Sequence, residues 1–138
     1  MPSCRICSVE LDIKTNWTLG LKRDNSHICK NCHRDISRDY RNSLTGKFNT
    51  YKIGARRRNI EFYLNMFDFA SISVNPCYYC GNKDSIYNGV DRKDCNVGYC
   101  LDNCVACCKM CNHMKQEYNS DDFINKCMEV SNHASKRM

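Results

Sequence analysis

The sequence predicts a small α+β protein that is stabilised by zinc, since it lacks the residues for a large hydrophobic core. Leu, Ile, Val and Phe make up 26 of the 138 residues, a fraction of about 19% that is typical of chains unable to build an ordinary core. The same chain has 13 cysteines, and its net charge is +6. The length fits one compact domain, or a small module attached to a second one.

Residues 1–33 are predicted to form an N-terminal zinc-binding module. Cys4-x2-Cys7 is followed, after 21 intervening residues, by Cys29-x2-Cys32. Two thiolates separated by two residues bind one ion from a tight turn, and two such turns complete a tetrahedral zinc site. The odd number of cysteines and the absence of a signal peptide argue against a secreted disulfide scaffold. We therefore expect an intracellular protein in a reducing compartment, either the cytoplasm or, for a viral protein, the host cell.

Residues 34–75 are predicted to form a basic helical segment that binds DNA and links the two ends of the chain. Between residues 34 and 58, eight basic residues face only two acidic ones, so this stretch alone carries a net charge equal to that of the whole protein. Apolar residues recur every three or four positions from Tyr40 to Ala55, which indicates a helix with an apolar stripe. Gly46 and Gly54 weaken the prediction of one continuous helix. The concentration of charge favours contact with phosphate groups over a merely solvated face.

Residues 76–138 contain a second pair of cysteine pairs. Cys77-x2-Cys80 is followed, after 27 intervening residues, by Cys108-x2-Cys111, and we expect these four residues to bind the second zinc. Cys107 adjoins Cys108 and is an alternative ligand, but the spacing to Cys111 favours Cys108. In a chain with so few apolar residues, each zinc site would contribute folding free energy on the order of 10 kcal/mol.

The sequence between and after these cysteines resembles the HNH endonuclease superfamily. The resemblance is carried by Gly89-Val90-Asp91-Arg92-Lys93-Asp94, Gly98-Tyr99, Asp102-Asn103 and the run from Cys108 to Lys115. It is similar to phage and viral members, whose core is a ββα-metal, treble-clef-like fold and which often carry an N-terminal CxxC...CxxC module. The resemblance implies a nuclease module over residues 76–138 with a C-terminal helix. The activity it implies is metal-dependent hydrolysis of DNA phosphodiester bonds.

The same resemblance implies roles for three residues of the motif. Asp91, on a hairpin strand, and Asn112, on the helix after Cys111, would hold a catalytic Mg²⁺ or Mn²⁺ ion, since both offer the hard oxygen ligands that these ions prefer. Asn103 would tie the hairpin together through its side-chain amide. The catalytic ion is thus distinct from the two structural zinc ions.

Arg92 stands where the best-studied HNH enzymes have the histidine that deprotonates water. A guanidinium, with a pKa above about 12, cannot act as a base, although it can bind phosphate or stabilise transition-state charge. The proton acceptor is left open among Asp94, His113, a metal-bound hydroxide and a second ion, with Asp94 favoured. The presence of Arg92 in place of the histidine also supports an alternative function, a zinc-dependent nucleic-acid-binding protein without nuclease activity.

The expected partner is DNA, bound mainly through its phosphate backbone. The candidate contacts are Lys52, Arg56, Arg57, Arg58, Lys109 and Lys115. No apolar run approaches the ~20 residues of a membrane span. A homodimer is compatible with the sequence, and a symmetric dimer would present two active sites to the two strands. The sequence does not indicate which DNA would be cut.

Overall fold

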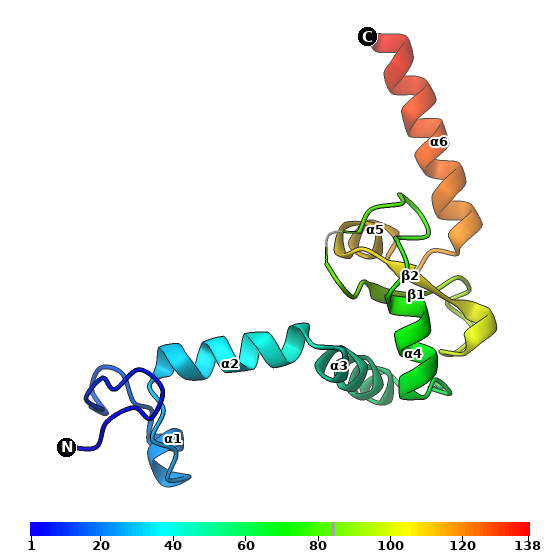
Figure 1. Cartoon of the computed structure of the whole chain (residues 1–138). Helices are drawn as coiled ribbons and strands as arrows, with labels where there is room; N and C mark the ends of the chain where they lie inside the picture. The colour runs from blue at the N-terminus through cyan, green and yellow to red at the C-terminus, as the bar shows by residue number, and fades with distance from the viewer. Residues whose placement is uncertain (84) are drawn as a thin grey trace. The chain divides into compact units, whose positions relative to one another are not determined.

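The computed structural model describes residues 1–83 and 85–138, which form two compact units. The N-terminal unit is Met1–Ser43 and the C-terminal unit is Leu44–Met138 (Figure 1). The predicted basic segment 34–75 is therefore divided, since its residues up to Ser43 belong to the first unit and the remainder to the second. In the part of the chain that the structure describes, no helix is both long and apolar enough to cross a membrane.

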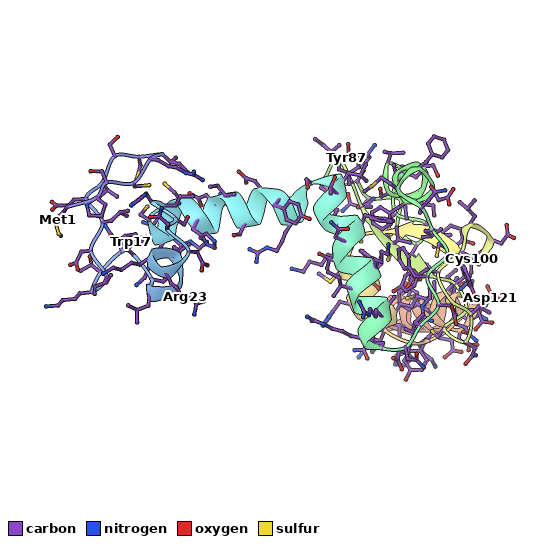
Figure 2. The ribbon with its side chains drawn as sticks, turned by 90° about the horizontal axis from the view of Figure 1, so that it is seen from below. Met1, Trp17, Arg23, Tyr87, Cys100 and Asp121 are labelled. Carbon is purple, nitrogen blue, oxygen red and sulfur yellow. The ribbon has the colours of Figure 1, made fainter. Side chains whose placement is uncertain are left out.

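The N-terminal unit contains helices α1 (Leu19–Arg23) and α2 (Lys30–Asn42) around a core that includes two of its cysteines. Trp17 lies inside this unit (Figure 2), where its indole Nε1 donates a hydrogen bond of 2.7 Å to the carbonyl of Ser26. The ring of His27 stacks on Trp17, with centroids 5.7 Å apart. The core of this unit is thus small and is built against its cysteine cluster.

The predicted apolar stripe is realised in a second helix, α3 (Leu44–Arg57), and not in one helix from residue 34. The helical conformation is interrupted at Ser43, whose backbone is extended (φ −70°, ψ 159°). The hydroxyl of Ser43 donates a hydrogen bond of 2.6 Å to the carbonyl of Tyr40. From Leu44 onward the stripe faces inward, because Phe48 and Tyr51 are partly buried against the core of the C-terminal unit and Ala55 is fully buried within it. Tyr40, in contrast, is exposed.

A two-stranded antiparallel hairpin forms the centre of the C-terminal unit. Strand β1 (Gly89–Arg92) pairs with β2 (Cys104–Cys107), with Val90 opposite Ala106, and a 3-10 turn, η1 (Leu101–Asn103), precedes β2. Helix α4 (Met66–Ser73) begins with a capping box between Asn65 and Asp68 and packs against both strands. The shared core thus joins α3, α4 and one face of the hairpin.

Two further helices complete the C-terminal unit, α5 (Lys109–Lys115) and α6 (Ser120–Arg137). Helix α5 follows β2 almost directly and packs against β1, so that β1, β2 and α5 form a ββα arrangement (Figure 1). This confirms the predicted fold class, a small α+β protein with a ββα core and two groups of four cysteines.

Two glycines of the motif allow the hairpin to approach its neighbours closely. A Cβ atom on Gly89 would clash with the hydroxyl of Tyr51, and a Cβ on Gly98 would lie 2.6 Å from the carbonyl oxygen of Glu61. Beside Gly98, Tyr99 donates its backbone N–H to the same carbonyl at 2.8 Å. The spacing of these glycines therefore reflects the packing of the hairpin and its loop against residues 51–62.

Candidate metal centres and catalytic pocket

The structure brings the two predicted sets of four cysteines together. In each set the four sulfur atoms lie within 4.8 Å of one another: Cys4, Cys7, Cys29 and Cys32 in one, and Cys77, Cys80, Cys108 and Cys111 in the other. Cys107 lies outside the second cluster, with its fully buried Sγ 3.4 Å from the carbonyl oxygen of Cys108. Four converging thiols are the donor set of a tetrahedral structural zinc site, so both clusters fit Zn²⁺.

The two clusters are built in the same way. Each first pair of cysteines is followed by a residue with positive φ, Ser8 (60°) in one and Gly81 (75°) in the other. Each second pair begins a helix, because Cys29 caps α2 and Cys108 caps α5. The Sγ of Cys108 accepts a hydrogen bond from the backbone N–H of Cys111 at 3.4 Å. The second cluster therefore determines where α5 starts relative to the hairpin.

Hydrogen bonds within the first cluster pull the thiol pKa values in opposite directions. Backbone N–H groups of Cys7 and Cys29 lower the pKa of Cys4 to about 6, which favours its thiolate. The pKa of Cys32 is raised to about 12, chiefly by its side-chain hydrogen bond with Cys7. Four thiolates repel one another at this distance, and a dication removes that repulsion. The cluster is thus suited to binding a metal with all its thiols ionised.

Asp91 on β1 is buried and held from two sides. The residue is 6% exposed, and its Oδ2 accepts a 2.7 Å hydrogen bond from the hydroxyl of Tyr79. Lys115 of α5 approaches the same oxygen at 3.2 Å and also donates to the carbonyl of Arg92 at 3.0 Å. Burial, together with the hydrogen bond to Asp91, raises the pKa of Tyr79 well above its ordinary value, so its hydroxyl stays protonated and donates.

The prediction that Lys115 contacts DNA is wrong. Its side chain is fully buried, and its ammonium group is engaged by Asp91 and by the backbone of β1. A charge this deep in the protein is tolerated because a carboxylate lies beside it. Lys115 therefore joins α5 to β1 and is inaccessible to phosphate.

A pocket of about 480 Å³ lies where β1 and α5 meet. Asp91 and Asn112, which the resemblance pairs as ligands of one ion, both line it. Among the described residues, no hydrogen bond to or from the side-chain amide of Asn112 is recorded, so its oxygen is available as a ligand. The other lining residues are Thr50, Tyr51, Gly54, Arg58, Val90, Arg92, Cys95, Tyr99, Gln116 and Glu117.

Two guanidinium groups lie against Tyr99 in the wall of this pocket. Arg92 donates from Nη1 to the carbonyls of Cys95 (2.7 Å) and Val97 (3.0 Å), with its Cζ 5.2 Å from the centre of the Tyr99 ring. Arg58, from the end of α3, donates from Nη2 to the Tyr99 hydroxyl at 3.0 Å. The pocket thus combines two oxygen ligands with two fixed positive charges, which suits a phosphate group.

Asn103 forms four hydrogen bonds through its side-chain amide. Its amide nitrogen donates to three carbonyls, those of Asp94, Val97 and Gly98, at 3.0 to 3.2 Å, and its oxygen accepts from the backbone N–H of Asp94 at 2.9 Å. These four bonds hold the loop between β1 and β2. The side chains of Asn103 and Arg92 both donate to the backbone carbonyl of Val97. Asn103 therefore helps to hold the carbonyl that positions Arg92.

Neither of the predicted protein bases lines the pocket with Asp91. The carboxylate of Asp94 accepts a hydrogen bond from the backbone N–H of Asn96 at 2.8 Å, within the turn after β1. His113 lines a neighbouring shallow hollow of about 370 Å³ with Lys109, and Asn112 and Gln116 line both this hollow and the pocket. Glu117 is the other acidic residue among those that line the pocket with Asp91.

Three side chains at or beside the pocket could not be predicted from the sequence, namely Tyr79, Tyr51 and Glu117. Tyr79 lies between Cys77 and Cys80, and the spacing of these cysteines predicts a zinc site but no role for the residues between them. Tyr51 lies in the apolar stripe of α3 and was interpreted only as a core residue, although its hydroxyl also accepts from the backbone N–H of Val90 at 3.0 Å. Glu117 follows α5 without any motif. No local signal in the sequence marks these three side chains.

The remaining candidate DNA contacts lie on α3, at its end and at the start of α5. Lys52 and Arg56 line a second hollow of about 390 Å³, and Arg57 is exposed beside them. Arg58 lines the pocket with Asp91, and Lys109 is exposed. All of these residues belong to the C-terminal unit, so the basic part of α3 and the candidate pocket are in one compact unit.

Comparison with known proteins gives one similar sequence and one similar structure. No established protein-family profile matches the chain. Uncharacterized protein R423 of Acanthamoeba polyphaga mimivirus is 41% identical over 95 residues, which are 68% of this chain but only 18% of the length of that protein. The structure is similar to that of PacI, a rare-cutting HNH restriction endonuclease, over 99% of this chain and 98% of the other, with a TM-score of 0.49 and 18% identity.

Proposed function

We propose that this protein is a metal-dependent DNA endonuclease of the HNH type, with two structural zinc ions and a catalytic Mg²⁺ or Mn²⁺ ion. The observation that carries the proposal is the pocket in which Asp91 and Asn112, 21 residues apart in sequence, lie together with Arg58 and Arg92. A carboxylate and an amide oxygen form a hard ligand pair suited to these ions, and they leave positions open for water and substrate.

The residues of the pocket would divide the work of phosphodiester hydrolysis. The bound cation would polarise the phosphate and stabilise the departing oxygen. Tyr79 and Lys115 hold the carboxylate of Asp91 in one orientation. Arg58 and Arg92 would neutralise the charge that builds up on the phosphate oxygens, since both guanidiniums are already fixed against Tyr99.

Glu117 is our candidate for the group that accepts the proton from the attacking water. It lines the same pocket as Asp91 and Asn112, and a carboxylate is a competent general base when it lies within reach of the water. Tyr51, which also lines the pocket, is unsuited to this role, because burial raises its pKa to about 12. Arg92 remains protonated at any physiological pH.

The decisive test is a plasmid-nicking assay with zinc-loaded protein and added Mg²⁺ or Mn²⁺. Asn112→Ala should lower the nicking rate by about 100-fold or more, since it removes an ion ligand. Glu117→Gln should lower it by about 100-fold or more by removing the base. His113→Ala should stay near the wild-type rate, because His113 does not line the pocket that Asp91 and Glu117 line. Asn112 is preferred to Asp91 as the target of substitution. Removing the Asp91 carboxylate would also leave the buried ammonium group of Lys115 without its counter-charge.

The same assay distinguishes the alternative function. If the plasmid stays supercoiled with every divalent cation while the protein still retards DNA in a gel, the nuclease proposal is wrong. The chain is then a zinc-dependent nucleic-acid-binding protein. If His113→Ala abolishes nicking while Glu117→Gln does not, the assignment of the base is wrong and the ion site stands.

DNA affinity should depend on the exposed arginines of α3 and should be insensitive to sequence. Arg56→Ala with Arg57→Ala is expected to reduce the slope of log K against log salt by about 2, because two phosphate contacts are lost. The matched control is Arg56→Lys with Arg57→Lys, which keeps both charges and should keep the slope. Fluorescence anisotropy on several unrelated duplexes measures this, and a loss confined to one sequence would contradict backbone contact.

A further inference from the structure

We propose that Gln116 is a further catalytic residue, whose side-chain amide donates a hydrogen bond to the phosphodiester held beside Asp91 and Asn112. This inference rests on the proposed nuclease function and adds one more group that contacts the substrate. Gln116 is exposed, and it lines both the pocket of Asp91 and the neighbouring hollow of Lys109. Its backbone conformation singles it out from the other residues that line the pocket.

The backbone of Gln116 has a conformation that glycine normally occupies. Its φ is 50° and its ψ is −122°, close to the first central position of a type II′ turn, with φ about 60° and ψ about −120°. The turn is closed by a hydrogen bond of 3.1 Å from the backbone N–H of Tyr118 to the carbonyl of Lys115. Glycine is preferred at this position because it has no Cβ. A glutamine here therefore costs folding stability that a glycine would not.

The chain is anchored on both sides of this turn. Before it, Lys115 ends α5 with its ammonium group buried against the carboxylate of Asp91. After it, the carbonyl of Glu117 accepts a hydrogen bond from the thiol of Cys95. A strained backbone persists where the surrounding structure over-determines it, and these two anchors hold Gln116 in the turn. The same anchors keep its side chain at the pocket.

The strain at this position indicates a use for the side chain. In the described part of the chain, the other non-glycine residues with positive φ are Ser8, Asn25 and Asn59. Asparagine tolerates positive φ because its short polar side chain can hydrogen-bond locally, and Ser8 belongs to the turn of the first cysteine cluster. Of these residues, Gln116 is the one that lines the pocket with Asp91. Strained residues cluster at functional sites, and the side chain is what a glycine would lack.

A side-chain amide in this pocket complements the two arginines. Its NH₂ group donates two hydrogen bonds, and fixed donors contribute most to the rate where negative charge develops in the transition state. Arg58 follows α3 and Arg92 belongs to β1, whereas Gln116 follows α5. The phosphate oxygens would therefore meet donors from three separate elements. Because glutamine is neutral, it adds a hydrogen bond without changing the charge of the pocket.

The test compares Gln116→Gly with Gln116→Ala in the full-length, zinc-loaded protein. Both variants lose the amide, but only glycine fits the turn without strain. In urea unfolding, the unfolding equilibrium constant of Gln116→Gly should be about 5-fold or more below that of Gln116→Ala. In plasmid nicking with Mg²⁺ or Mn²⁺, both should lower kcat by about 10-fold or more while KM stays within about 2-fold, since a contact to developing charge is lost. The control Asn25→Gly, at a positive φ in the other unit, should keep kcat.

The expected signature is a glycine variant that is more stable than the alanine variant and still less active than the wild type. A merely structural residue would keep or gain activity when its strain is relieved. If the wild type nicks DNA and Gln116→Gly matches its kcat, this inference is wrong and the nuclease proposal stands. A loss of activity in Gln116→Gly alone, or a rise in KM without a fall in kcat, would also refute the contact. A wild-type protein that nicks no DNA overturns both proposals.

Discussion

Cys80→Ser is expected to unfold the C-terminal unit while the N-terminal unit keeps its fold. Structural zinc sites contribute about 10–16 kcal/mol of apparent binding free energy, which is comparable to the whole stability of a domain, about 5–15 kcal/mol. The second cluster anchors both the turn at Cys77–Cys80 and the start of α5. Because Cys80 is exposed, the serine itself creates no buried polar group, and the loss reports on the metal site alone.

The two units offer separate signals for this experiment. The single tryptophan of the chain, Trp17, lies in the N-terminal unit, so its fluorescence reports on that unit only. Far-UV circular dichroism reports the helices of both. We expect the zinc content to fall from two ions per chain to one, with a loss of helicity and unchanged Trp17 emission. Cys127→Ser, outside both clusters, should keep two ions. Zinc-free wild-type protein that remains folded would contradict the structural role.

Lys115→Met is expected to lower the free energy of unfolding of the C-terminal unit by about 3–5 kcal/mol. The substitution preserves much of the side-chain volume but leaves the Asp91 carboxylate buried without its counter-charge. Breaking one partner of a buried ion pair typically costs this much. The remaining hydrogen bond from Tyr79 cannot supply the missing positive charge.

Urea unfolding of zinc-saturated protein measures this effect. The double variant Lys115→Met, Asp91→Asn should recover most of the loss, since no uncompensated charge then remains. Lys109→Met is the matched control, because Lys109 lies on the same helix but is exposed, and it should change the stability by less than about 0.5 kcal/mol. A loss below about 1 kcal/mol for Lys115→Met would show that Asp91 is solvated instead of buried.

The cysteine clusters could be predicted from the sequence because chelation is largely local. A Cys-x2-Cys turn places two sulfurs on one side of a tight loop, so the spacing alone indicates a half-site. The four half-sites then combine in the order in which they occur along the chain, the first with the second and the third with the fourth. The choice of Cys108 over Cys107 could be predicted for the same reason, as its spacing to Cys111 repeats that of Cys29 and Cys32. The structure brings these sulfurs together as expected.

The surroundings of Asp91 could not be predicted in this way, because they depend on tertiary packing. Lys115 lies 24 residues from Asp91 and reaches it only when α5 packs on β1. In the sequence it is one more lysine in a basic protein, and most lysines are exposed. The break at Ser43 was equally hidden, because no proline or glycine marks it and the apolar stripe continues across it.

In each cysteine cluster, one residue is exposed to solvent. Cys7 and Cys80 are exposed and Cys32 is half-buried, whereas Cys4, Cys29, Cys77, Cys108 and Cys111 are buried. Peroxide, alkylating agents and competing soft metals would therefore meet these two thiolates first. With zinc bound, capture of either sulfur would leave three ligands on the ion, so chemical damage would begin as metal loss at the second cysteine of each leading pair.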